Sequence, residues 1–377
     1  MNGSVRDRNL ARLLRLVHVG GPLSRAQLTE ATGLNRSTIG DLVSRLERAG
    51  MVREAAPTVT AGRVGRPSPV VAASPHVVAI AVNPEVDAVE FAVVGLDRSI
   101  RDRVRVEQDE PPSPEAVAAL IGERVAAWSS DSLRECTVSG IGVAVPGMVS
   151  IGDGVVRDAP HLRWRDVRLQ SLLAADTGLP VVVDNDATLG MLAEHLFGAA
   201  RGYAHAVYLN GGASGIGGGL VVAGNVVRGT GGFAGEFGQN RPGVIDPADR
   251  CSVDGVLEDE VSRARLLADA GLVHADDARL ATALRRSGDS PEVGRQRRVL
   301  ATAIANAVNV LNPAVAVVGG FLATLVGADL DGFEDAVRAQ AMPSNAADVR
   351  VRLAELAEDR LLMGAAEYVF ETQLLAG

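Results

Sequence analysis

Residues 24–50, SRAQLTEATGLNRSTIGDLVSRLERAG, contain two helical segments separated by a short turn. Ser24 and Gln27 have the spacing of a capping box, which satisfies two backbone donors at the start of a helix, and Gly33 ends that helix. A second helix is predicted from Arg36 to Ala49. Its buried stripe consists of Ile39, Leu42, Val43 and Leu46. Two short helices joined by a tight glycine-containing turn predict a helix-turn-helix, whose second helix enters the major groove of DNA.

The flanking segments extend this motif to a winged helix-turn-helix over residues 1–72. Apolar residues recur at helical spacing from Asn9 to Val17, and Gly20-Gly21-Pro22 ends that segment. Residues 51–53 are predicted to form a short strand. Residues 60–67, TAGRVGRP, are predicted to form the wing, whose arginines are suited to the minor groove or to phosphates.

The charge distribution agrees with a DNA-binding head. Residues 1–72 contain eleven arginines and five acidic residues, a balance of +6, although the whole chain has a net charge of −9. A basic head on an acidic body is typical of a nucleic-acid-binding module joined to a second domain. The side chains expected to contact DNA are Arg25, Arg36, Ser37, Thr38, Arg45, Arg63 and Arg66. The alternative is a small helical bundle whose arginines only face solvent.

Length and composition limit the other function classes. The 377 residues are enough for two or three domains. No stretch approaches about 18 uncharged apolar residues, and no charged-then-apolar leader is present, so we expect neither a membrane span nor export. Cys136 and Cys251 lie far apart and suggest no disulfide framework, which fits a reducing cytoplasm.

From residue 75 onward, apolar strands alternate with helices, a pattern that predicts an α/β fold. Two lobes of similar size, each with its own early hairpin and later crossovers, suggest a duplicated fold with a cleft between them. The predicted lobes are residues 75–187 and 188–359, and the C-terminal helix, residues 360–377, is expected to pack back on the first lobe. A glycine-dense turn is predicted over residues 211–219, either as a phosphate cradle or as a tight turn.

Four motifs in the body, taken in their order and spacing, resemble the ROK family of repressors, open reading frames and sugar kinases. They are Gly142-Val143-Ala144-Val145-Pro146-Gly147, Asn185-Asp186-Ala187, the run from Gly215-Ile216-Gly217-Gly218-Gly219 to Gly235-Glu236-Phe237-Gly238, and Asn312-Pro313 leading to Gly319-Gly320. The resemblance runs over essentially the whole chain, including a head that only the family's regulators have. It implies a two-lobed, actin-like sugar-kinase fold, which is a duplicated ribonuclease H-like fold.

The resemblance also implies a set of ligand-binding residues. Asn185 and Asp186 would face the hydroxyls of a sugar, and in the family's kinases the aspartate is the general base. Glu236 and Glu258 fall where the family has sugar-binding glutamates, Gln239 falls where it has a histidine, and His161 falls where it often has an asparagine. The alternative role for Asp186 is to cap the helix that follows it.

Two departures from the family's pattern indicate that catalysis and metal binding are lost. The kinases begin this fold with an Asp-x-Gly-Gly-Thr turn around the ATP phosphates, but here residues 83–87 read NPEVD. Carboxylates at Glu85 and Asp87 would repel a triphosphate, so Asp186 would be a vestigial base. The family's zinc motif keeps one cysteine, Cys251, and one thiolate cannot form a tetrahedral site, so we expect neither metal nor cofactor.

These observations together predict a transcriptional regulator, with a repressor as the expected kind. It would bind a pseudo-palindromic operator in double-stranded DNA as a homodimer or dimer of dimers, and it would respond to a sugar or sugar phosphate. No membrane partner is expected. Two alternatives stay open: an ATP-dependent sugar kinase, and a regulator whose body serves only for dimerisation.

Overall fold

The computed structural model describes residues 5–55, 69–212, 214–244, 246–253, 255–273, 275, 277–287 and 290–375. The chain divides into two compact units. Unit 1 contains Met1–Ala144, Arg168–Val183 and Ala365–Gly377, and unit 2 contains Val145–Val167 and Asp184–Gly364. The boundaries predicted between the head and the two lobes stay a prediction, since this division groups the head with the first lobe. No helix among the described residues is long and apolar enough to cross a membrane.

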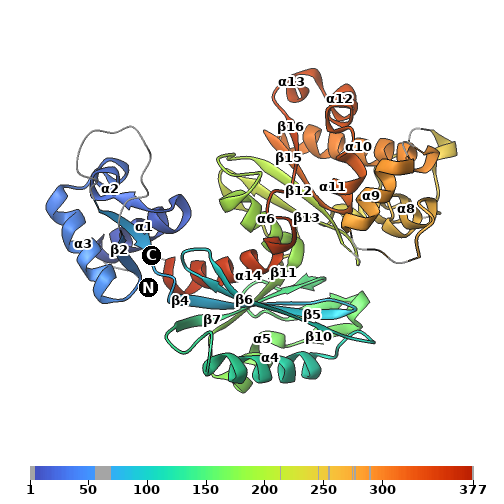
Figure 1. Cartoon of the computed structure of the whole chain (residues 1–377). Coiled ribbons are helices and arrows are strands. Elements are labelled where there is room, and N and C mark those ends of the chain that lie inside the picture. Colours follow the sequence, from blue (N-terminus) through green and yellow to red (C-terminus); the bar gives the residue numbers. More distant parts are fainter. Residues whose placement is uncertain are drawn as a thin grey trace. The chain divides into compact units, whose positions relative to one another are not determined.

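The N-terminal head contains the predicted helix-turn-helix (blue in Figure 1), whereas the predicted wing, residues 60–67, lies outside the described residues. Its elements are α1 (Val5–Gly20), β1 (Leu23–Ser24), α2 (Arg25–Thr32), α3 (Arg36–Arg48), β2 (Val52–Ala55) and β3 (Val70–Ala73). The predicted capping box at Ser24 is present, and Gly33 ends α2 in the left-handed conformation. The apolar stripe of α3 is buried, as are Leu13 and Val17 of α1 and Leu28 of α2, and α3 contacts both of these helices. Strand β3, which was not predicted, pairs with both β1 and β2.

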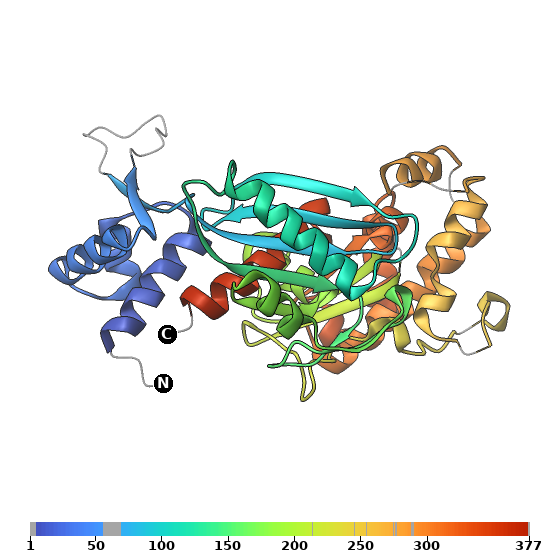
Figure 2. The same ribbon diagram turned by 90° about the horizontal axis from the view of Figure 1, so that it is seen from below.

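The sheet of unit 1 has the strand order β11-β7-β4-β5-β6. Its strands are β4 (Val77–Pro84), β5 (Ala88–Gly95), β6 (Ile100–Glu107), β7 (Thr137–Val145) and β11 (Val181–Asn185). Two helices, α4 (Pro114–Ser129) and α5 (Leu169–Thr177), lie side by side on one face (Figures 1 and 2). Trp128 of α4 packs edge-on against Phe91 of β5, with ring centroids 6.5 Å apart.

The sheet of unit 2 repeats this topology in the order β14-β13-β12-β15-β16. Its strands are β12 (Ala206–Gly212), β13 (Gly215–Val222), β14 (Asn225–Val226), β15 (Val315–Gly320) and β16 (Arg350–Leu353). Each sheet begins with three antiparallel strands in sequence and then adds a strand parallel to the first of them. The repeated order confirms the predicted duplicated α/β fold.

Alternation along β12 gives the second sheet two apolar faces. Val207 and Leu209 join the large core with α10, whereas Tyr208 joins the smaller cluster with Met191 of α6. The remaining elements are β8 (Met148–Val149), β9 (Val156–Ala159), η1 (Pro160–Leu162), β10 (Trp164–Val167), α6 (Asp186–Phe197), η2 (Phe237–Gln239), η3 (Pro247–Asp249), α7 (Leu257–Glu260), α8 (Arg263–Asp269), α9 (Asp277–Ser287), α10 (Pro291–Leu311), α11 (Phe321–Val326), α12 (Leu330–Gln340), α13 (Pro343–Ala346), η4 (Ala357–Asp359), α14 (Arg360–Phe370) and a π-helical turn at Glu371–Leu375.

The predicted glycine-dense turn over residues 211–219 is wrong in its extent, because all six of these glycines lie in strands β12 and β13. A Cβ at Gly217 would lie 2.7 Å from the Cβ of Ala187, and a Cβ at Gly219 would lie 2.5 Å from that of Met191. Both neighbours belong to α6. Gly217 and Gly219 therefore allow α6 to pack directly on β13, and this close packing accounts for these two glycines.

Helix α14 packs on strand β7 in the same way. A Cβ at Gly142 would lie 2.1 Å from the backbone oxygen of Ala365 and 3.1 Å from Cγ2 of Val369. Helix α14 buries its apolar side chains, including Leu362, Val369 and Phe370. The glycine in the predicted family motif is thus required by the approach of the C-terminal helix.

We expect Gly142→Ala to lower the free energy of unfolding by about 1–3 kcal/mol or more, because the added methyl group must displace the backbone of α14. Gly122→Ala is the matched control: Gly122 lies in α4 with no heavy atom within 4 Å of its ideal Cβ position. Since alanine is the better helix former, this change should stabilise the protein by up to about 1 kcal/mol. Urea denaturation of both variants checks the prediction, and an equally neutral Gly142→Ala would contradict it.

Candidate functional site

The start of α6 places two of the predicted ligand-binding residues. The N-cap of this helix is Asn185, whose Oδ1 accepts from the backbone N–H of Thr188 at 2.9 Å. Its Nδ2 donates to the backbone oxygen of Gly147 at 3.0 Å. Asp186 is the first residue of the helix, and its Oδ1 accepts from the N–H of Ala187 at 2.8 Å. The capping role considered for Asp186 therefore belongs to Asn185.

A cavity of about 390 Å³ surrounds this helix start. All six residues predicted to bind ligand line it, and all six belong to unit 2. The lining residues are Pro146, Gly147, Met148, Asp158, Pro160, His161, Asn185, Asp186, Asn210, Gly212, Ser214, Gly215, Ile216, Gly217, Glu236, Gln239 and Glu258. The fold thus brings together segments separated by about a hundred residues of sequence into one polar cavity large enough for a small ligand.

The cavity is acidic. Four carboxylates line it, from Asp158, Asp186, Glu236 and Glu258, and its lining contains neither arginine nor lysine. Burial raises the pKa of Asp186 to about 6, against the opposing effects of the Ala187 N–H and the charge of Arg360. Burial and the neighbouring carboxylate of Glu258 also raise the pKa of Glu236. Carboxylates accept hydrogen bonds from hydroxyl groups but repel anions.

Gln239 contacts another of the predicted residues directly. Its Nε2 donates to Oε1 of Glu258 at 2.5 Å, and the backbone N–H of Ile216 donates to Oε2 of Glu258 at 3.4 Å. His161 lies on η1 with an exposed side chain at the edge of the cavity. The carboxamide at position 239 therefore orients Glu258, where the family's pattern has an imidazole.

Three polar lining residues, Asp158, Asn210 and Ser214, were not in the predicted set. Asn210 interrupts the apolar run of β12, and a polar residue near the end of a buried strand is a signal that could have identified it. Asp158 lies on the short strand β9, within a small sheet that the sequence did not predict. No feature of the sequence near Asp158 pointed to the cavity.

The head presents part of the predicted DNA-contacting set at the start of α3. Arg36 and Ser37 are exposed, whereas Thr38 and Arg45 are half-buried. The N-cap Asn35 holds the backbone of this turn through Thr38, at 2.8 Å, and also accepts from the hydroxyl of Ser37 at 2.7 Å. Arg25 is exposed and forms an ion pair with Glu54 of β2 at 2.6 Å. The predicted residues Arg63 and Arg66 lie outside the described residues.

The turn between β4 and β5 differs in chemistry from a phosphate cradle. The backbone N–H of Glu85 donates to the oxygen of Ala88 at 2.8 Å, which closes a tight hairpin. Asn83 donates to Oε1 of Glu85 at 3.2 Å, and Asp87 forms an ion pair with Arg105 of β6 at 3.1 Å. Side-chain carboxylates therefore occupy a turn whose backbone N–H groups a phosphate would need.

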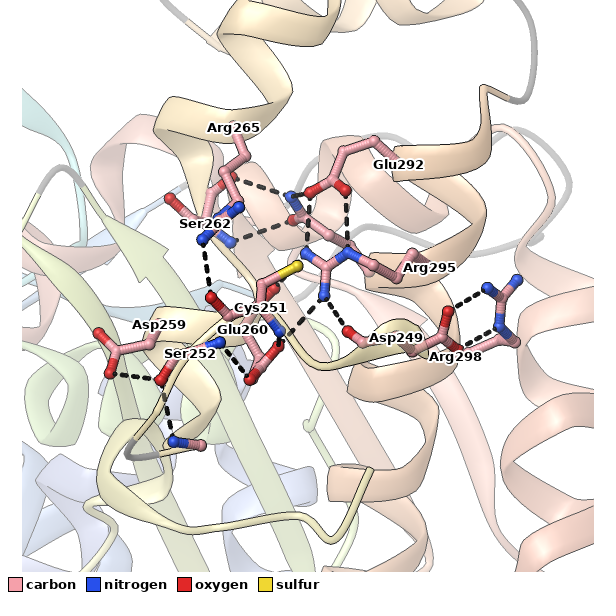
Figure 3. Close-up of polar contacts among 12 residues, drawn as sticks. Asp249, Cys251, Ser252, Asp259, Glu260, Ser262, Arg265, Glu292, Arg295 and Arg298 are labelled. Carbon is pink, nitrogen blue, oxygen red and sulfur yellow. Dashed lines mark hydrogen bonds and ion pairs between the residues drawn. The ribbon is translucent and has the colours of Figure 1, made fainter. Parts of the chain in front are cut away.

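The segment aligned with the family's zinc motif is held by a buried network of polar contacts (Figure 3). Glu260 is fully buried and accepts from the backbone N–H groups of Cys251 at 2.8 Å and Ser252 at 3.0 Å. Arg295 of α10 donates to Glu260, to the carboxylate of Glu292 and to the backbone oxygen of Asp249. All five guanidinium N–H groups have an acceptor, so the buried cation is fully hydrogen-bonded.

This network also fixes the cavity wall, because Glu260 and Glu258 lie on the same short helix α7. Glu258 extends into the cavity while Glu260 is tied to α10. Among the described residues, no group of three histidines, cysteines or acids could hold a metal ion. Ionic and backbone contacts hold the loop and α7 in this structure.

Comparison with known proteins finds a match to the model of the ROK family over residues 79–372. A candidate xylose repressor of Caldicellulosiruptor sp. (strain Rt8B.4) is 27% identical over 98% of this chain and 97% of its own length. A glucokinase of Halalkalibacterium halodurans is 31% identical, but over 60% of this chain and 74% of its own. The crystal structure of a ROK family transcriptional regulator, a homolog of the E. coli MLC protein, covers 99% of this chain and 98% of its own, with a TM-score of 0.74 and 22% identity. The regulators' alignments thus include the head, and the fold is shared over the whole chain.

The raised pKa of Asp186 predicts a pH-dependent stability. Between its ordinary value of 3.8 and about 6, the folded protein keeps a proton that the unfolded chain has released. The stability of the wild type relative to Asp186→Asn should therefore fall as the pH rises through this interval and stay constant above about pH 7. Thermal denaturation of both proteins from pH 4 to 8 measures the difference in Tm, and a difference that does not change with pH would refute the shift.

The Arg295 network predicts a large cost for losing its cation. Arg295→Met should lower the free energy of unfolding by about 3–5 kcal/mol, because Glu260 would stay buried without its counter-ion. Arg298→Met is the control, since Arg298 pairs with Asp249 on the surface and should contribute only about 0–1 kcal/mol. Urea unfolding measures both losses. Similar losses in the two variants would contradict the prediction that the buried ion pair of Arg295 contributes more to stability than the pair of Arg298. Treatment with EDTA should leave the wild-type midpoint unchanged.

Proposed function

The chain belongs to the ROK family, as one of its transcriptional regulators, and we propose that it binds operator DNA through the head and a neutral sugar in the cavity of unit 2. The observation that carries this proposal is the presence, in one chain, of a helix-turn-helix and of a cavity lined by all six predicted sugar-binding residues. Arg36 and Ser37, exposed at the start of α3, are suited to phosphates and base edges.

The electrostatics of the cavity favour a neutral sugar over a sugar phosphate. A phosphate group would need a cation or a cluster of backbone N–H groups, and the cavity lining offers four carboxylates and no arginine or lysine. Vicinal hydroxyls, in contrast, can donate to Asp158, Asp186 and Glu236. The names of the repressor relatives make D-xylose the first sugar to test.

We infer that the protein does not transfer phosphate. The base at Asp186 is retained, but the turn at residues 83–87 presents Glu85 and Asp87 where the family's kinases present glycine and threonine. The close packing of β13 against α6 gives its glycines a role without any nucleotide. Without a phosphate site, the carboxylate of Asp186 can accept a hydrogen bond from a sugar hydroxyl, but it has no bound nucleotide for that hydroxyl to attack.

Helix α14 has residues in both units, and we propose that it couples the cavity to the head. Its first residue, Arg360, donates to Asn210 in the cavity wall at 3.1 Å. Near its other end, Glu367 accepts from the buried imidazole of His18 on α1 at 2.5 Å, and Glu371 in the following turn pairs with Arg15 of α1 at 3.3 Å. A ligand that binds more tightly to one position of Arg360 would shift the equilibrium of α14 and of its contacts with α1. Such a difference in affinity between two arrangements is what coupling requires.

The proposed assembly is a homodimer, or a dimer of dimers, in which two heads bind the half-sites of a pseudo-palindromic operator. Such a protein acts on chromosomal DNA, so we place it in the cytoplasm. Repression is the expected sign of regulation, by analogy with the relatives' names.

A DNA-binding assay with and without sugar tests the proposal. Fluorescence anisotropy with duplex DNA from upstream of the protein's own gene should detect binding that weakens by about tenfold or more between 50 and 200 mM salt. D-xylose or another neutral sugar should change the affinity by about 5- to 150-fold. Arg36→Ala should weaken binding by about tenfold, whereas Asp186→Asn should keep DNA affinity and lose the response to sugar.

The competing functions give different results. Sustained ADP release with ATP and a hexose, abolished by Asp186→Asn, would identify a kinase and overturn the proposal. DNA binding that ignores every neutral sugar and sugar phosphate, with no change in Tm on adding them, would leave the body a dimerisation domain. A response to sugar phosphates alone would contradict the argument from the acidic cavity.

A further inference from the structure

Asn210 forms a small buried cluster with Tyr208 and Arg360. The side chain of Asn210 is 4% exposed, and its Oδ1 accepts from the hydroxyl of Tyr208 at 3.2 Å and from Nε of Arg360 at 3.1 Å. A guanidinium group can only donate hydrogen bonds. The oxygen of the carboxamide must therefore face Arg360, which fixes the orientation of the whole amide group.

Two glycines of β15 make room for this cluster. Asn210 is paired with Gly319 across the parallel β12–β15 ladder. A Cβ at Gly319 would lie 2.9 Å from the hydroxyl oxygen of Tyr208 and 3.0 Å from Oδ1 of Asn210, and a Cβ at Gly320 would lie 3.2 Å from the same Oδ1. Gly319 is thus explained by the space that the carboxamide and Tyr208 occupy, whereas a Cβ at Gly320 would first meet the backbone oxygen of Gly211, at 1.9 Å.

The other half of the carboxamide, the Nδ2 amino group, is directed at the cavity. Asn210 lines the cavity, whereas its two partners Tyr208 and Arg360 do not. Nδ2 makes no hydrogen bond to any described residue, although the side chain is almost completely buried. Nδ2 is not among the buried side-chain atoms that lack a partner, so it is accessible, and a ligand in the cavity that Asn210 lines can accept a hydrogen bond from it.

This donor differs from the four carboxylates around it. Asp158, Asp186, Glu236 and Glu258 can only accept hydrogen bonds when ionised, so they recognise the hydroxyl hydrogens of a ligand. An uncharged oxygen that has no hydrogen to offer, such as a ring oxygen, or the lone pairs of a hydroxyl group, needs a donor instead. Within the cavity, Asn210 supplies a donor that is held in one orientation.

We propose that Asn210 is a ligand-binding residue that donates from Nδ2 to an uncharged oxygen of the sugar, and that Tyr208 and Arg360 are positioning residues that hold its amide in this orientation. The inference rests on the proposed function, since it concerns the same cavity. It adds a specificity element: a ligand must present an acceptor oxygen to Asn210 and hydroxyl donors to the carboxylates. Because Arg360 begins α14, the residue that orients this donor also begins the helix that contacts the head.

The test is the affinity of the whole protein for D-xylose and D-glucose, measured by isothermal titration at sugar concentrations up to about 100 mM. Asn210→Asp keeps the size of the side chain and an oxygen for Arg360, but it replaces the donor by an acceptor. We expect it to weaken sugar binding by about tenfold or more, because a cavity built to donate to an oxygen discriminates strongly when the donor is lost. Asn225→Asp is the control, since Asn225 lies exposed on β14, outside the cavity, with Nδ2 bonded to Ala223.

A double-mutant cycle separates positioning from a merely structural role. At pH 8, Arg360→Met should weaken sugar binding in the wild type but have no further effect in the Asn210→Ala background, because Arg360 acts through Asn210. Equal losses in both backgrounds would overturn the role of Arg360. The Tm of each variant without sugar, and its DNA affinity, show that the fold persists.

The remaining outcomes are distinguishable. If the wild type binds a sugar and Asn210→Asp binds it equally well, this inference fails while the proposed function stands. If the wild type binds neither sugar at 100 mM, the sensor part of the proposed function and this inference are both overturned.

Discussion

The approach of α14 to strands and helices that lack side chains at the contact is the constraint on which the proposed mechanism depends. Gly142 leaves room for the backbone oxygen of Ala365, and a Cβ at Gly364 would lie 2.1 Å from the backbone oxygen of Leu189. Within unit 2, Arg360 at the start of α14 donates to Asn210 of the cavity wall, and within unit 1, Glu367 of the same helix accepts from His18 of α1. Burial disfavours a charged His18 there, yet the carboxylate of Glu367 raises its pKa above the ordinary value.

The residues proposed to bind a sugar and the turn that would bind a nucleotide differ in their chemistry. Asp186 keeps its place at the start of α6, where burial raises its pKa, and Asn185 caps that helix. The turn that a nucleotide would need is closed on itself by ionic and backbone contacts around Glu85 and Asp87. Under the proposed function, a fold shared with kinases serves as a sensor without a phosphate turn, because sugar hydroxyls and phosphates are recognised by different groups.

The segment aligned with the family's zinc motif is held by ionic and backbone contacts in this structure. Glu260 binds two backbone N–H groups of the loop and the guanidinium group of Arg295, so it organises a segment that the family's pattern assigns to zinc ligands (Figure 3). Since Glu258 lies two residues away on α7, the network supports the cavity from outside. A fully satisfied buried cation can replace a metal as a fixed point, whereas a half-satisfied one would destabilise the loop.

Local patterns in the sequence were sufficient for the helix-turn-helix and the alternation of strands and helices, because capping boxes and apolar periodicity are properties of neighbouring residues. The six cavity residues came from the resemblance to the family's ordered motifs. The extent of the glycine turn was wrong, since only the packing of α6 shows that Gly217 and Gly219 belong to a strand. Asn210, Asp158 and the Arg295 network were not foreseen at all. Tertiary structure alone decided these, because hydrogen-bond orientation and charge pairing depend on groups that are far apart in sequence and meet only in the folded chain.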